Sequence, residues 1–271
     1  MFKKKIYFHA DDYGRSSQIS KNILSCLRFG SLNSVSIIIN KNLKHHNKLK
    51  KLKKIKKKLH INLTDRPYLK NKNKKLFQKL SFLKLLLMND QDKKKIFEEI
   101  DYQIVQFIKI YKPKNLMIDG HEHIQMIPWI FNYLYKKKKF YKIYEIRNSN
   151  ESIIIPRLND LINLKYYRNL LAFFVVKFLF YINKRKNLNS PTFTGLIYSG
   201  IQDYKTLKRT SIFYKNKKFN KLEILIHPGY CDHKEKLQFD KSYFNFYNSN
   251  SRKVEYNLCF SKEINKLLNF I

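Results

Sequence analysis

Short apolar segments alternate with amphipathic segments from one end of the chain to the other. The apolar segments predict strands at residues 6–8, 35–39, 59–64, 116–118, 141–147 and 222–226. The amphipathic segments predict helices at residues 16–29, 42–58, 92–111, 158–186 and 252–269, with a further helix beginning at Pro128. Residues 65–89 are expected to form a loop with a short helical piece. The alternation predicts an α/β fold with a mostly parallel sheet or barrel. Because no repeat or linker interrupts the pattern, we expect one domain over residues 1–271.

Four of the predicted strands contain, or are followed by, polar residues of types that carry chemistry. The residues are Asp11 and Asp12 after the first strand, His60 within the third, His121 and His123 after the fourth, and His227 after the last. In a parallel barrel these strand ends converge on one face. A single histidine at such a position is usually a hydrogen-bonded structural residue, but four converging polar positions favour a functional site.

The adjacent carboxylates of Asp11 and Asp12 repel each other unless a positive charge lies between them or one is protonated. A divalent metal ion would remove the conflict. One aspartate could then bind the ion, and the other could accept a proton from water bound to it. The alternative is a solvent-exposed turn closed by Gly14.

His121 and His123 stand two positions apart. If the fourth strand continues through them, both side chains point to the same side, so one can bind the metal while the other supports it. One aspartate with two histidines suits a catalytic divalent ion. Non-haem iron oxygenases use the same ligand types but bring His-x-Asp together on one strand. Because Asp12 stands first and alone, iron is the less favoured alternative.

The chain is strongly basic, with 56 Lys and Arg against 20 Asp and Glu and a formal net charge of +36. Its richness in Lys, Asn and Ile is also what an AT-rich genome would produce, and we favour this explanation over a polyanionic partner. The charge should still attract nucleic acid or anionic lipid non-specifically at low salt. Aromatic residues do not interleave with the lysines of residues 42–58, so no specific nucleic-acid surface is expected.

The three cysteines are scattered, and the N-terminus shows no apolar signal segment, which predicts a cytoplasmic protein. The longest apolar run, residues 170–182, has thirteen residues and contains Lys177, too short and too charged to span a bilayer. The helix at residues 158–186 could contact a membrane surface as a peripheral anchor. We favour instead a helix packed on the barrel or at a homodimer interface.

Taken together, the motifs resemble those of the YdjC-like carbohydrate deacetylases, a family that includes the chitooligosaccharide deacetylases and the hopanoid-biosynthesis-associated deacetylases. The similar pieces, in order, are ADDYG (10–14), LHINLT (59–64), IDGHEHIQMIP (118–128), the strand ending at Arg147, TGLIYSG (194–200), EILIHPGY (223–230) and the pair Arg252 and Glu255. The resemblance covers nearly the whole chain. It implies a distorted TIM-like (β/α) barrel and a hydrolase that removes an N-acetyl group from an amino sugar.

The resemblance also implies roles for individual residues. Asp12, His60 and His121 would bind a divalent metal ion, with Mg²⁺ preferred over Zn²⁺ although both are compatible with these ligands. Asp11 would be the general base and His227 the general acid. His123 and Arg147 are expected at the substrate, although a structural ion pair is an equal alternative for Arg147. The family often has a histidine where this chain has Gln125, which could alter specificity.

Two functions of different classes follow. The first is a metal-dependent deacetylase acting on an N-acetylated oligosaccharide or glycolipid. The second is a basic protein that binds nucleic acid or an anionic membrane without catalysis. The polar strand ends favour the first, because a binding module needs no such set of residues.

Overall fold

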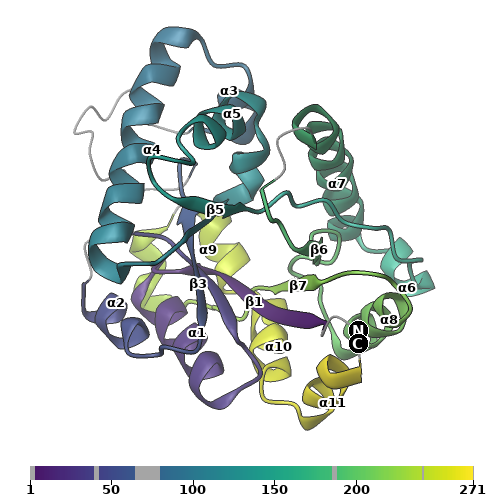
Figure 1. Ribbon diagram of the computed structural model, residues 1–271. Coiled ribbons are helices and arrows are strands. Elements are labelled where there is room, and N and C mark those ends of the chain that lie inside the picture. Colours follow the sequence, from purple (N-terminus) through teal and green to yellow (C-terminus); the bar gives the residue numbers. More distant parts are fainter. Residues whose placement is uncertain (1–3, 40–42, 65–79, 185–187, 240, 271) are drawn as a thin grey trace.

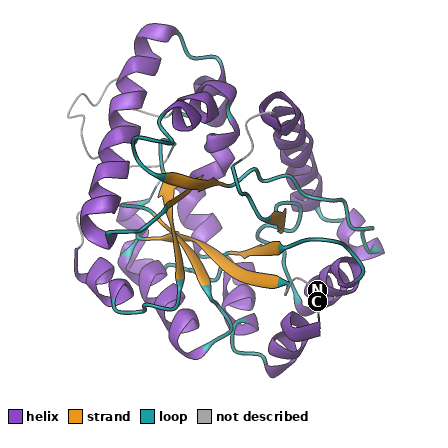
Figure 2. Cartoon of the chain, viewed as in Figure 1, coloured by secondary structure: helices purple, strands orange, loops and turns teal. Residues whose placement is uncertain are grey.

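The computed structural model describes residues 4–39, 43–64, 80–184, 188–239 and 241–270, and within them seven strands form one curved parallel sheet (Figures 1 and 2). The strands are β1 (Lys5–Tyr13), β2 (Ser34–Ile37), β3 (Lys56–Ile61), β4 (Leu116–Gly120), β5 (Ile143–Ile146), β6 (Thr192–Thr194) and β7 (Lys221–Ile226). Their spatial order is β5-β4-β3-β2-β1-β7-β6, and every neighbouring pair is parallel.

The two edge strands, β5 and β6, curl toward each other. The segment that leads into β6 bonds to β5, because the Ile146 amide donates to the Leu188 carbonyl at 3.3 Å. Just beyond β5, the Asn148 amide donates to Ser190 Oγ at 2.9 Å. The sheet is therefore the distorted TIM-like barrel expected from the sequence, with its last side closed by these contacts.

Helices surround the sheet (Figure 2). The α-helices are α1 (Ser17–Phe29), α2 (Leu43–Lys50), α3 (Phe82–Leu86), α4 (Asp90–Tyr111), α5 (Pro128–Lys136), α6 (Leu158–Leu161), α7 (Leu164–Asn183), α8 (Tyr204–Lys215), α9 (Lys241–Tyr247), α10 (Asn250–Leu258) and α11 (Lys262–Phe270). Two 3₁₀ segments are η1 (His121–Met126) and η3 (His233–Gln238). The start of α1 is capped by Ser16 and that of α4 by Asn89, each accepting from an amide three residues on. The predicted helices at residues 16–29, 92–111 and after Pro128 are confirmed.

Some boundaries differ from the prediction. The helix expected over residues 42–58 ends at Lys50 in α2, and the chain re-enters the sheet at Lys56. The predicted helix 158–186 is divided into α6 and α7 because Asn163 caps the start of α7. The C-terminal helix is likewise divided into α10 and α11. Residues 65–79 lie outside the described residues, and α3 is the short helical piece expected before residue 89. Strand β6 and helix α8 were not predicted.

The inside of the barrel holds charged side chains rather than a purely apolar core. Lys58 of β3 is fully buried and forms ion pairs with Glu145 of β5, at 2.7 Å, and with Glu223 of β7. Because β3 and β7 are separated in the sheet by β2 and β1, this contact crosses the interior. Lys56 extends the group with a 2.7 Å contact to Glu145. These lysines look like surface residues in the sequence, which explains why the predicted helix 42–58 includes them.

Hydrophobic packing lies mainly between the sheet and its helices, where Phe8, Ile19, Ile100 and Ile118 belong to one buried cluster. A second cluster joins α7 to β6 and β7 through Phe173, Phe193 and Leu225. Among the described residues, no helix combines the length and apolar character needed to cross a membrane.

Candidate metal centre

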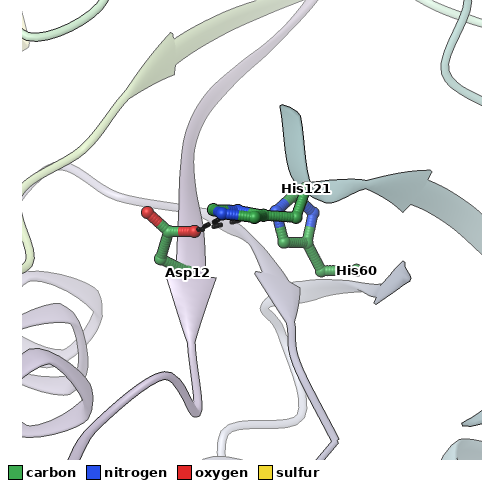
Figure 3. Close-up of side chains that lie close together, drawn as sticks. All are labelled: Asp12, His60 and His121. Carbon is green, nitrogen blue, oxygen red and sulfur yellow. Dashed lines mark ion pairs between the residues drawn. The ribbon is translucent and has the colours of Figure 1, made fainter. Parts of the chain in front are cut away.

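Three polar residues meet at the C-terminal ends of three strands of the sheet (Figure 3). They are Asp12 near the end of β1, His60 near the end of β3, and His121 directly after β4. Asp12 Oδ1 lies 3.1 Å from His121 Nδ1 and 3.8 Å from His60 Nε2. One potential ligand atom from each of the three residues lies within 4.8 Å of the others, and all three residues are buried. The three residues singled out as metal ligands are therefore brought together.

A backbone irregularity in β1 turns Asp12 toward the histidines. The pairing of β1 with β2 shifts register between Ala10 and Tyr13, which is the signature of a bulge. Asp12 itself has a φ of 71°, a left-handed conformation that non-glycine residues adopt infrequently. A regular strand would point Asp12 to the face opposite Asp11, whereas the bulge lets both carboxylates reach the same cavity.

The ring of His60 is held by Asp119 at the end of β4. His60 Nδ1 lies 2.7 Å from Asp119 Oδ1. Because an ionised carboxylate only accepts hydrogen bonds, Nδ1 must donate, and a neutral ring then keeps its lone pair on Nε2. A histidine that donates to a carboxylate through one nitrogen and offers the other to an ion is the usual arrangement in metalloproteins.

The donor set fits a divalent cation. Metal–ligand bonds of about 2.0–2.2 Å place neighbouring ligand atoms roughly 3–3.5 Å apart, close to the separations around Asp12 Oδ1. That oxygen is buried, and none of the described residues donates a well-aligned hydrogen bond to it. Burial alone would raise the pKa of Asp12, but the contact with His121 and the charge of Arg252 hold it below its usual range. Asp12 therefore presents a carboxylate ion beside two imidazoles.

Asp11 faces the barrel interior, where Arg147 binds it with two hydrogen bonds, both of 2.9 Å. His9 Nε2 lies 3.0 Å from Asp11 Oδ1. Burial alone would raise the pKa of Asp11, but the Arg147 guanidinium, with His60 and His9 nearby, holds it well below its usual range. Asp11 is therefore ionised and fixed in position next to the metal-ligand candidates.

Arg147 does not lie where a sugar could reach it. Its side chain is fully buried, and besides Asp11 it contacts Asp119 at 2.8 Å and Glu223 at 2.7 Å. The expectation that Arg147 binds substrate is corrected by this position, and the alternative of a structural ion pair is the one observed. His9, Asp11 and Asp119 also lie close enough together to hold a metal ion. The Arg147 guanidinium, however, already supplies a positive charge to the two carboxylates of this group.

A cavity of about 750 Å³ opens beside the three ligand candidates. Six of the seven predicted site residues line it, namely Asp11, Asp12, His60, His121, His123 and His227. Its other walls include apolar side chains from α3, α7 and α9, among them Leu83, Leu171 and Tyr243. The cavity therefore has a charged floor and largely apolar walls.

The sequence analysis allowed for a fourth strand that continues through His121 and His123. In the structure, β4 does not continue through them. It ends at Gly120, and left-handed conformations at Glu122 (φ 53°) and His123 (φ 58°) turn the chain within η1. Both histidines line the cavity nonetheless. His123 Nδ1 contacts Ser149 Oγ at 2.9 Å. Burial and the charge of Arg147 lower the pKa of His123 to about 4.

His227 directly follows β7 on the cavity wall. Its backbone amide donates to Glu255, and its carbonyl accepts from Arg252 Nη1 at 3.2 Å. Burial and the charge of Arg252 lower the pKa of His227 to about 3. The imidazole is therefore neutral near pH 7 in the free protein, which bears on its expected role as an acid.

Several buried residues of the site carried no role in the sequence analysis. They are His9, Asp119, Glu223, Arg252 and Glu255. His9 could have been found, because it alternates with Asp11 and so shares its face of the strand. Gln125, where the family often has histidine, is buried and donates to the Arg147 carbonyl and to Ser149 Oγ. It supports the loop after β5 and is not among the residues that line the cavity.

The chain is similar to known proteins. A family model described as YdjC-like protein matches residues 5–269. A carbohydrate deacetylase from Danio rerio is 25% identical over 136 residues, a match that spans 46% of this chain and 44% of that protein. It therefore covers less than half of the relative's length. A solved structure from Enterococcus faecalis, to whose protein cellobiose-phosphate cleavage has been attributed, superimposes with a TM-score of 0.69 and 16% identity over 98% of this chain and 94% of the other. This last similarity shows the fold alone.

Proposed function

The chain belongs to the YdjC-like protein family, and we propose that it is a metal-dependent hydrolase that removes N-acetyl groups from amino sugars and releases acetate. The observation that carries the proposal is the meeting of Asp12, His60 and His121 with a second, ionised carboxylate beside them. The name of the Danio rerio relative supports the substrate class.

A divalent ion held by Asp12, His60 and His121 would lower the pKa of water to about 7 and polarise the acetyl carbonyl. Asp11 is the base in this proposal, and it takes the proton of the attacking water. Arg147 and His9 hold the Asp11 carboxylate in one orientation, so the proton is accepted without rearrangement of the base. Breaking the carbon–nitrogen bond then yields acetate and a free amine.

The departing amine needs a proton, and His227 is the candidate that delivers it. Because the imidazole is neutral in the free protein, it must first gain a proton during the reaction. The water supplies that proton, since hydrolysis of an amide transfers hydrogen from water to the amine. We infer that His227 relays a proton that Asp11 has accepted, rather than holding one beforehand.

The walls of the cavity suit a sugar. Tyr243 and Phe246 on one side can stack on the apolar face of a pyranose ring. His123, placed by Ser149, is the residue best situated to bond a sugar hydroxyl. A cavity of about 750 Å³ leaves room for more than the acetamido group itself.

The identity of the metal is part of the proposal. Two imidazoles and one carboxylate are typical of Zn²⁺ and related transition ions, whereas Mg²⁺ prefers oxygen ligands and retains several waters. This chemistry weakens the preference for Mg²⁺ drawn from the sequence. Reconstituting metal-free protein with Zn²⁺, Co²⁺, Mn²⁺ or Mg²⁺ and measuring activity for each distinguishes the ions.

The test is acetate release from N-acetylglucosamine and its β-1,4 oligomers. We expect release by the metal-loaded protein, none after chelation, and recovery when metal is returned. The variant Asp12→Ala should stay inactive when metal is returned. Absence of acetate from the whole panel under every metal, with the protein folded and loaded, would overturn the proposal and leave a non-catalytic binding protein as the alternative.

A further inference from the structure

Helices α6 and α7 carry a long apolar surface on the outside of the molecule. Exposed apolar residues recur along α7 every three or four positions, at Leu164, Tyr167, Leu171, Phe174, Phe178 and Tyr181. They continue across α6 and the next residue through Leu158, Leu161 and Ile162. Leu158, Ile162 and Leu164 are 83%, 83% and 84% exposed. We call these nine residues the α6–α7 face.

The opposite side of α7 already packs on the barrel. Tyr166, Phe173, Val176 and Leu179 are buried in the cluster that includes Phe193 of β6. The exposed residues are therefore not needed to attach the helix to the fold. A contiguous apolar surface of this length on a soluble domain normally marks a place where something binds.

The charged residues of α7 are all positive, and the acidic residue of α6, Asp160, is buried and paired with Arg157. Residues 161–184 include Lys165, Arg168, Lys177 and Lys184 and contain no Asp or Glu. A second copy docked on the same face would bring these like charges together. An anionic bilayer would instead attract them, at roughly 1 kcal/mol for each basic residue near its surface. Charge complementarity therefore selects a membrane over a homodimer.

The α6–α7 face also borders the cavity of the candidate metal centre. Leu171 belongs to the face and lines the cavity, and its neighbours Arg168 and Val175, which are not part of the face, line the cavity as well. On another wall of the cavity, Leu83 of α3 is 61% exposed. Apolar side chains of α3 and α7, together with the basic side chain of Arg168, therefore line part of the cavity.

We propose that the α6–α7 face binds the surface of anionic membranes, with α7 lying in the headgroup region and the cavity opening toward the lipid. A helix that is apolar outward, basic at its borders and fixed to the domain by its other side has the properties of an interfacial helix rather than a spanning one. Resting on the proposed deacetylase function, a further consequence is that an N-acetylated sugar on a lipid can reach the metal centre from the membrane.

Vesicle flotation of the 271-residue chain tests the docking directly. The vesicles are phosphatidylcholine with about one-third phosphatidylserine, at physiological ionic strength. The variant Phe174→Ser/Phe178→Ser removes two exposed aromatic residues that do not line the cavity. The matched control, Phe29→Ser/Phe140→Ser, removes two phenylalanines elsewhere on the surface that are more exposed (78% and 75%) than Phe174 and Phe178 (55% and 65%). We expect the first variant to bind at least tenfold more weakly and the control to bind like the wild type.

Equal binding by the two variants would overturn the proposal, because it would show that the overall charge alone drives adsorption. Sedimentation velocity without vesicles tests the alternative that a second copy of the chain binds the α6–α7 face. A wild-type dimer that Phe174→Ser/Phe178→Ser dissociates would assign the face to a second copy and also overturn the proposal. Acetate release from soluble oligomers should be unchanged in both variants. If no variant and no substrate gives acetate, the proposed function fails, but the flotation result still decides the docking.

Discussion

Asp11 and Arg147 form a bidentate ion pair inside the barrel, with both hydrogen bonds at 2.9 Å. The neighbouring Asp12 instead turns toward His60 and His121. The pair therefore gives two adjacent and chemically identical side chains different surroundings. One is bound to a fixed cation of the protein, and the other remains directed at the place where a metal ion fits.

Replacing Arg147 with lysine should distinguish the effect of orienting the Asp11 carboxylate from the effect of a positive charge beside it. Lysine keeps the positive charge but cannot make two parallel hydrogen bonds to one carboxylate. We expect Arg147→Lys to lower kcat by about 100-fold through loss of the Asp11 orientation. KM and metal content should change little. Steady-state acetate release measures kcat and KM, and elemental analysis measures the metal content. A kcat close to that of the wild type would show that the two parallel hydrogen bonds from Arg147 to Asp11 are not needed.

The two aspartates should respond differently to the same substitution. Asp11→Asn removes the proposed base and should lower kcat by roughly 10²–10⁴-fold while leaving the bound metal in place. Asp12→Asn removes a charged ligand and should lower the metal content itself. The comparison is made by elemental analysis after dialysis, with acetate release in parallel. Metal loss in Asp11→Asn but not in Asp12→Asn would mean that the two roles are reversed.

Asp119 should influence the metal without touching it. It fixes the ring of His60 through the 2.7 Å contact to Nδ1, and carboxylates in this position contribute about 10–100-fold to metal affinity. We expect Asp119→Asn to weaken metal binding by that amount, as measured by competition with a chromogenic chelator. Ser36→Ala is the control, because Ser36 Oγ also bonds to Asp119 without contacting His60. Equal metal affinity in Asp119→Asn and the wild type would contradict the assignment.

Much of the site could be predicted because it lies at strand ends. Asp12, His60, His121 and His227 each follow or close a short apolar run, and the parallel sheet brings such ends together. The position of Arg147 could not be predicted, since a strand-end arginine that faces a substrate and one that faces three carboxylates have the same local sequence. The position of Lys58 in a strand could not be predicted for a similar reason. Its partners, Glu145 and Glu223, are about 90 and 165 residues away, beyond the reach of any local pattern.

Lys58 should be one of the most important residues for stability. It is fully buried between Glu145 and Glu223, and removing one partner of a buried ion pair typically costs about 3–5 kcal/mol. We expect Lys58→Met to lower the free energy of unfolding by that amount in urea denaturation. Lys21→Met, at an exposed position of α1, should change it by less than about 0.5 kcal/mol. Similar values for both variants would show that the interior pairs contribute nothing.

The ion pair between Lys58 and Glu223 should make the free energy of unfolding depend on pH. Burial alone would raise the pKa of Glu223, but Lys58 and Arg147 hold it well below its usual range. A carboxyl with a depressed pKa in the folded state stabilises the protein above its unfolded pKa, about 4.3, and loses that contribution as the pH falls further. Because Lys58→Met removes one of the two cations, its deficit relative to the wild type should narrow below about pH 4.3. Urea denaturation across a pH series measures the difference, and a deficit that stays constant into the acid range would show that Lys58 does not act through the charge of Glu223.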